Sequence, residues 1–228
     1  MMITILVSAQ TVSAGTIAVE WRLGDRGGQV LVPVDMALPA SLSQSDYSRA
    51  ELVAMGFLLL KRKVVGQKYL KQKLTLLFSE KMALDAFQDI SSDLGLRNAA
   101  RGLQVVFGDA ICSLHYGPLP TLKAPLVSRL MSSKPQLPAL AMICGKVVVT
   151  VHALEQFAFR YRIATLAHAY HLLQRWASRA TQPVTLPPAV LAHKEQVQQE
   201  PALYYTDGSG WHGTIVDNTL VTMFFRKN

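Results

Sequence analysis

The segment SRAELVAMGFLLLKRK, at residues 48–63, joins an acidic side chain to a run of bases. Glu51 stands at the head of an apolar helical pattern, which ends at the bases 61–63. Its carboxylate could help to hold divalent metal ions if acids such as Glu80 or Asp109 approached it. The other interpretation is an exposed acid in the first turn of a helix, favoured there by the helix dipole.

Basic side chains are concentrated in the stretch 61–73, which contains Tyr69 and no acid, in a chain of formal net charge +8. The bases are Lys61, Arg62, Lys63, Lys68, Lys71 and Lys73. Such a cluster suits a polyanion, because each phosphate contact releases counterions and adds affinity. The stretch therefore predicts nucleic-acid binding, and the alternative is a solvated helix end followed by a basic loop.

The composition excludes several classes of protein. Half of the 228 residues are hydrophobic and 17% are charged, which is typical of globular domains. The apolar run 52–60 is about half the length that crosses a bilayer, so no membrane partner is expected. Cys112 and Cys144 lie far apart without a CxxC spacing, which indicates free thiols and a cytoplasmic protein. Without a Walker, GxGxxG or zinc-finger motif no cofactor is expected, and the pair His168 and His171 lacks a third metal ligand at helical spacing.

Seven elements are predicted in the first half, in the order β-β-β-α-β-α-β. Alternation of apolar residues indicates the strands, and a period near 3.6 indicates the helices. The strands are expected at 2–10, 15–24, 29–38, 73–79 and 101–110, and the helices at 80–95 and in the segment that ends at the bases 61–63. Ser45 or Asp46 is the expected N-cap of the first helix, and Gly95 the end of the second.

This order resembles the ribonuclease H-like fold, and local patterns extend the resemblance over about residues 2–110. The first helix of that family carries an AEL pattern whose glutamate is a metal ligand, and RAELVAMGFLLL supplies Ala50, Glu51 and Leu52 here. The next strand of the family ends in Asp-Ser, whereas LTLLFSEKMAL has Ser79 in place of that aspartate.

The resemblance implies an α/β domain without catalysis. Ribonuclease H chemistry needs several carboxylates that hold two divalent ions about 4 Å apart. In this chain VSAQ, residues 7–10, stands where the first strand would carry Asp-Gly, and Ser79 stands at the second aspartate. Glu51 lacks its partner acids, so the first half is expected to be a silent relative.

A proline-rich connector separates the two halves. Five prolines lie within residues 116–140, and SSKPQLP at 132–138 is the expected boundary. We therefore predict a first domain over 1–131, a linker over 132–144 and a second domain over 145–228.

The second half predicts a small domain of helix plus antiparallel sheet, of the α+β class. Residues 145–180 begin with a short strand and continue as one or two helices, and residues 202–228 predict three strands with turns at DGSG and DN. Trp211 and His212 are expected at the tip of the first turn, where they could contact a nucleotide.

Three residues of the second half form a spaced pattern. His152 begins the helix in TVHALEQFAFRYRI, Arg160 follows two turns later, and Thr222 lies in the final strand, NTLVTMFFR. The pattern resembles the RelE, barnase, EndoU and colicin RNase-like toxins, whose signature is His-Ala-x-x-Arg-x-x-x-Arg with a last strand of the type Val-Val-Thr-Val. Gln156 departs from that signature at the first arginine.

That resemblance implies metal-free cleavage of RNA. His152 would be the acid or base, Arg160 would hold the phosphate with help from Arg162 or Arg226, and Thr222 would hydrogen-bond a phosphate oxygen. The missing arginine weakens the charge stabilisation and leaves open a domain that binds RNA without cutting it.

Together these patterns predict a basic two-domain protein that binds nucleic acid, with RNA favoured over DNA. One form of it is a metal-independent endoribonuclease of the toxin type, opposed by a protein antitoxin. The alternative is a non-enzymatic phage- or plasmid-borne binding or inhibitor protein built on degenerate nuclease folds. A third reading is a metal-dependent nuclease at Glu51, whose activity EDTA would abolish. The expected nucleic-acid-binding residues are Lys61, Arg62, Lys63, Lys68, Lys71, Lys73, Arg162, His212 and Arg226.

Overall fold

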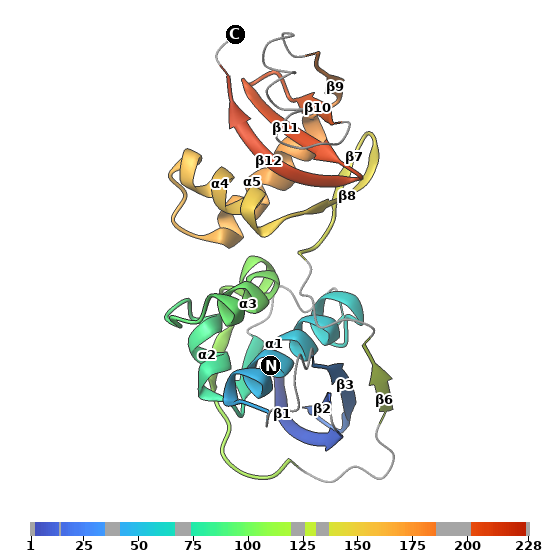
Figure 1. Cartoon of the computed structure of the whole chain (residues 1–228), viewed down its shortest axis with the longest axis vertical. Coiled ribbons are helices and arrows are strands. Elements are labelled where there is room, and N and C mark those ends of the chain that lie inside the picture. Colours follow the sequence, from blue (N-terminus) through green and yellow to red (C-terminus); the bar gives the residue numbers. More distant parts are fainter. Residues whose placement is uncertain are drawn as a thin grey trace. The chain divides into compact units, whose positions relative to one another are not determined.

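The computed structural model divides the chain into two compact units, Met1–Pro135 and Gln136–Asn228 (Figure 1). It describes residues 3–13, 15–34, 42–66, 74–119, 126–130, 137–185 and 202–226. The division falls inside the linker predicted at 132–144. Residues Leu140–Met142 of that predicted linker form a strand, β7, which belongs to the second unit.

The first unit is built on a mixed six-stranded sheet with the order β5-β4-β1-β2-β3-β6. Its strands are β1 (Ile3–Ser13), β2 (Thr16–Leu23), β3 (Arg26–Pro33), β4 (Leu74–Phe78), β5 (Ile111–Leu114) and β6 (Leu126–Arg129). The first three strands pair antiparallel, so the predicted meander is confirmed. Strand β4 runs parallel to β1, β5 parallel to β4, and β6 parallel to β3.

The first helix, α1 (Gln44–Gly56), starts earlier than expected. Its N-cap is Ser43, whose side chain accepts a hydrogen bond from the backbone N–H of Asp46, while the Asp46 carboxylate accepts one from the backbone N–H of Ser43. This reciprocal capping box corrects the prediction of Ser45 or Asp46 as the cap. The helix continues into a π-helical stretch, η1 (Phe57–Lys61).

Two helices stand where one helix and one strand were predicted. They are α2 (Lys81–Phe87) and α3 (Leu94–Phe107), so the predicted strand at 101–110 is wrong. Asp93 caps α3 by accepting a hydrogen bond from the N–H of Leu96, and the apolar face of α3 is buried. Burial of a continuous helical face outweighs the strand preference of the valines in RGLQVVFGDA.

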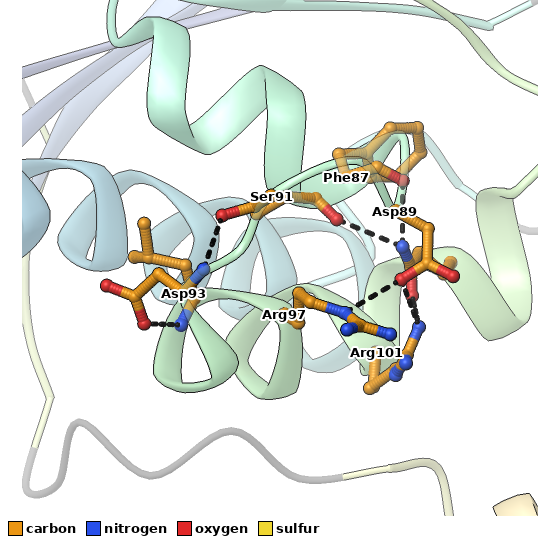
Figure 2. Close-up of polar contacts among 9 residues, drawn as sticks. Phe87, Asp89, Ser91, Asp93, Arg97 and Arg101 are labelled. Atoms are coloured by element: carbon orange, nitrogen blue, oxygen red, sulfur yellow. Dashed lines mark hydrogen bonds and ion pairs between the residues drawn. The ribbon is translucent and has the colours of Figure 1, made fainter.

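The turn between α2 and α3 is held by ion pairs, shown in Figure 2. Asp89, at φ 65°, receives hydrogen bonds from Arg97 (3.1 Å) and from the buried Arg101 (2.9 Å). Gln104 donates to the carbonyls of Ala86 and Phe87, which are at the end of α2. These bonds add a side-chain donor to carbonyls of the last turn of α2, where backbone donors become scarce.

The core of the first unit lies between the sheet and its helices. Helix α1 packs against β1 and β2, and α3 packs against α1. The side chains that fill this layer, all 0 to 1% exposed, are Ile5, Val7, Ile17, Val19, Leu52, Met55, Leu58 and Leu103.

The second unit has its own six-stranded sheet, with the order β7-β8-β12-β11-β10-β9. The remaining elements are β8 (Gly145–Val149), α4 (Val151–Tyr161), α5 (Leu166–Arg179), β9 (Gln182–Pro183), β10 (Leu203–Thr206), β11 (Trp211–Val216) and β12 (Thr219–Phe225). The three predicted C-terminal strands are confirmed as an antiparallel set. The sheet is nevertheless mixed rather than antiparallel throughout, because β8 runs parallel to β12.

Both helices of this unit pack on the same face of β11. The ring of Trp211 lies 5.3 Å from that of Phe157 on α4. A Cβ atom at Gly213 would lie 2.4 Å from the ring of Trp176 on α5. Since residues two apart point to the same side of a strand, Trp211 and Gly213 define the helix-covered face.

Candidate functional site

Glu51 lies in the third turn of α1 and is completely buried. The interpretation of Glu51 as an exposed first-turn acid is therefore wrong. The physical reason is the early start of the helix at Gln44, which places residue 51 over the sheet rather than at the solvated helix end.

The carboxylate of Glu51 accepts four hydrogen bonds, one from the interior of β1 and three from the residues that follow β4. Its Oε1 atom accepts from the N–H of Ala9 in β1 at 3.2 Å, and from the N–H and hydroxyl of Ser79 at 3.3 and 2.5 Å. Its Oε2 atom accepts from the N–H of Glu80 at 3.1 Å. Ser79 follows β4 directly, so Glu51 ties α1 to the neighbouring strands β1 and β4.

Burial raises the pKa of the Glu51 carboxyl from 4.5 to about 7. Desolvation is the largest cause, and the charge of Glu80 raises the pKa further. The hydrogen bonds from Ser79 and Glu80 stabilise the ionised form and lower the pKa, but less than burial raises it. The buried carboxyl of Glu51 therefore binds its proton up to a higher pH than an exposed glutamate does.

The acids proposed as partners of Glu51 do not form a metal centre with it. Glu80 is the N-cap residue of α2, and Asp109 is exposed in the connection between α3 and β5. Within the described ranges, no group of three His, Cys, Asp or Glu side chains could hold a metal ion. His168 and His171 are exposed on α5.

Three of the predicted basic residues lie together at the end of η1. Lys61, Arg62 and Lys63 are all exposed, and Lys63 has a left-handed backbone with φ 51°. The guanidinium of Arg62 lies 5.9 Å from the centre of the Phe57 ring. Lys68, Lys71 and Lys73 lie outside the described residues.

A fourth exposed base, Arg26, joins them from the first position of β3. Its Nη2 atom donates to the carbonyl of Val64 at 3.1 Å. Sequence reasoning missed Arg26 because the contact links positions 38 residues apart. Arg26, Lys61, Arg62 and Lys63 are called the basic surface below.

The structure does not gather His152, Arg160 and Thr222 into one site. His152 is exposed in the first turn of α4, and Arg160 lies eight residues on, about 12 Å along the helix axis. Arg160 donates from Nη1 to the carbonyl of Met223.

Thr222 lies on the sheet face opposite to α4. It pairs with Thr214, whereas its neighbour Met223 pairs with Gly213 on the helix-covered face. Because successive strand residues point to opposite faces, the Thr222 hydroxyl points away from His152 and Arg160.

His212 and Trp211 lie inside β11 rather than at the tip of the hairpin turn. His212 is 4% exposed, its ring stacks on that of Phe224 at 5.2 Å, and its Nδ1 atom lies 3.0 Å from the carbonyl oxygen of Gly210. A buried imidazole in this position does not reach a nucleotide at the turn. The turn itself is formed by residues 207–210, which precede the strand.

An open pocket of about 520 Å³ lies where the ends of α4 and β12 meet β11. It is lined by Arg160, Trp211, Phe224 and Phe225. The remaining predicted bases, Arg162 and Arg226, are exposed, and each directly follows one of these two elements in the chain.

No family model, curated protein or solved structure matches this chain. Among the helices of the described segments, none combines the length and apolar character that a membrane span requires.

Both cysteines are free and partly buried.

Proposed function

We propose that this protein binds nucleic acid at the basic surface and does not cleave it. The observation that carries the proposal is the convergence of Arg26 with Lys61, Arg62 and Lys63 at one exposed place. None of these four side chains forms an ion pair with another described residue. Unneutralised cations of this kind attract phosphates through counterion release.

A ribonuclease H-like origin of the first unit is part of the proposal. The strand order β3-β2-β1-β4-β5, with three antiparallel strands followed by two parallel ones, supports it. So does the placement of Glu51 against β1 and the end of β4, and β6 adds a strand beyond the expected pattern. RNA is the expected ligand and the cytoplasm the expected compartment.

Two features of the described residues support the proposed absence of cleavage. The Glu51 oxygens are already occupied by four internal donors, and no further acids complete a metal site around it. Of the residues that match the toxin signature, His152 is exposed in the first turn of α4, whereas Thr222 lies on the sheet face opposite to α4. These features favour the non-enzymatic alternative over an endoribonuclease.

Fluorescence anisotropy over a range of salt concentrations tests the binding. The variant Lys61→Gln, Arg62→Gln, Lys63→Asn should bind RNA more weakly, and the slope of log affinity against log salt should fall by about 0.7–0.9 for each lost phosphate contact. Asparagine is chosen at 63 because it tolerates positive φ.

A matched control removes three exposed bases elsewhere: Arg49→Gln, Lys146→Gln and Arg175→Gln. Both triple variants lower the net charge from +8 by the same three units. Equal losses of affinity in the two variants would show that total charge, and not the basic surface, drives binding.

Incubation with total RNA tests the absence of cleavage. Wild type should leave the RNA intact with EDTA and with Mg²⁺. Cleavage that survives EDTA and disappears in His152→Ala would overturn this part of the proposal in favour of a metal-free ribonuclease.

A further inference from the structure

We propose that the pocket lined by Arg160, Trp211, Phe224 and Phe225 binds an unpaired base of single-stranded nucleic acid. This inference rests on the proposed function and adds to it the form of the ligand. The first unit contributes charge through its basic surface, whereas the pocket in the second unit contributes a place for one base.

Aromatic rings form the body of the pocket. Trp211 stacks on Tyr161 with ring centres 4.5 Å apart and planes inclined by 16°, and Phe225 meets Trp211 edge-on at 5.4 Å. Phe157 supports Trp211 from α4 at 5.3 Å, with its own ring 1% exposed. The rings are thus held in place before a ligand arrives.

Part of this cluster remains open to solvent. Phe225 is 50% exposed and Tyr161 42% exposed, although both lie against the buried Trp211. Exposed aromatic rings on a rigid support are the stacking platforms that proteins use for unpaired bases, since every base has a π-face. The cavity volume falls within the range of about 300–1,000 Å³ found for small-molecule sites.

Cations surround the same rings. Arg160 lines the pocket itself, and Arg162 and Arg226 are exposed just beyond α4 and β12. Arg226 lies beside Trp211 through the bond from its N–H to the carbonyl of Gly210 at 2.9 Å. Nearby Asp207 is largely neutralised, because its buried carboxylate pairs with Arg179 at 3.3 Å.

The charge and the rings together select the ligand. The arginines match the phosphates on either side of a base, while the rings require that base to be unpaired and unstacked from its neighbours. Bases of a duplex are stacked inside the helix and do not meet this requirement. The pocket is expected to take any of the bases, because stacking does not depend on hydrogen-bond readout.

The test compares strands with and without bases. Full-length wild type is titrated into a fluorescein-labelled single strand of about 16 nucleotides, in RNA and in DNA form, and into an abasic strand of the same length and charge. The intact strands should bind about tenfold or more tightly than the abasic strand and than the corresponding duplex.

Variants at Phe225 show whether the pocket is responsible. Phe225→Leu keeps an apolar side chain but has no ring, and it should reduce the preference for intact over abasic strands to near unity. Phe225→Tyr keeps the ring and should preserve the preference. Arg160→Gln should weaken binding to both strands, since it removes a phosphate contact.

The two proposals fail in different ways. If wild type binds no nucleic acid of any form, the proposed function fails and the pocket proposal falls with it. If wild type binds intact, abasic and duplex forms equally, or if Phe225→Leu retains the full preference, the pocket proposal is overturned while binding at the basic surface stands.

Discussion

At the residue scale, burial affects the pKa of Glu51 more than hydrogen bonding does. Four donors surround its carboxylate, yet desolvation still raises its pKa to about 7. The folded protein therefore keeps this proton over a pH range in which the unfolded chain has already lost it. Linkage then makes the stability of the fold depend on pH.

The free energy of unfolding should fall as pH rises from 4.5 to about 7, by up to about 3 kcal/mol, and then level off. The sign follows because the native state binds more protons than the unfolded state throughout this interval. Urea unfolding at several pH values measures it. Glu51→Gln has no carboxyl to titrate and should lack this component, so parallel pH slopes for wild type and variant would disprove the assignment.

The sequence located Glu51 but could not give its environment. The AEL pattern placed the glutamate on the first helix correctly, although residues 50–55 are buried in succession and the helix has no exposed polar face there. Its four donors come from Ala9, Ser79 and Glu80, which are 42, 28 and 29 positions away. Burial created by such distant contacts leaves no local signature in the sequence.

At the element scale, the second unit depends on close approach of α5 to β11. Gly213 sits where an added Cβ would lie 2.4 Å from the Trp176 ring and 2.9 Å from Leu220. Gly213→Ala should therefore destabilise the second unit by about 1–3 kcal/mol, because Trp176 is 2% exposed and has little room to move.

Thermal unfolding followed by circular dichroism measures this loss, and Gly56→Ala is its control. Gly56 is helical and has no other atom within 4 Å of the added methyl group, so alanine there should leave stability unchanged or raise it by up to about 1 kcal/mol. An unaltered transition in Gly213→Ala would show that α5 shifts freely on the sheet.

Elements with a strong local signal were predictable, and those chosen by tertiary packing were not. The antiparallel meander was predicted from alternation and turn residues alone. Helix α3 was missed because Val105 and Val106 favour strands, whereas the buried stripe that includes Leu96, Ala99 and Leu103 decides for a helix. Whether this segment forms a strand or a helix depends on α1 and α2, against which α3 packs.

The candidate site shows the same limit. The bases at 61–63 were found from composition, but Arg26 was not, because its side chain meets Val64 only in the folded chain. Likewise Thr222 matched a motif, although strand register places its hydroxyl on the face away from α4. A one-residue difference in register is invisible in a short motif.

At the scale of the whole molecule, each unit carries a core of its own. The first is assembled from residues between Ile3 and Leu130, and the second contains Phe157, Trp176 and Met223. Residues 1–135 and residues 136–228, produced as separate proteins, should each unfold in a single cooperative transition. Denaturant titrations followed by tryptophan fluorescence measure this. A fragment that lacks a transition would show that its core needs the other unit.

The π-helical stretch η1 has a consequence for chain length. Here the N–H of Arg62 bonds to the carbonyl of Phe57, five residues back, so the stretch uses one residue more per closed turn than an α-helix. A variant with a deletion of one residue between Phe57 and Lys61 could close as an ordinary α-helix while both flanking segments stay in place. Such a deletion should therefore shorten the chain at this point while the bases that follow η1 and the sheet beneath keep their places.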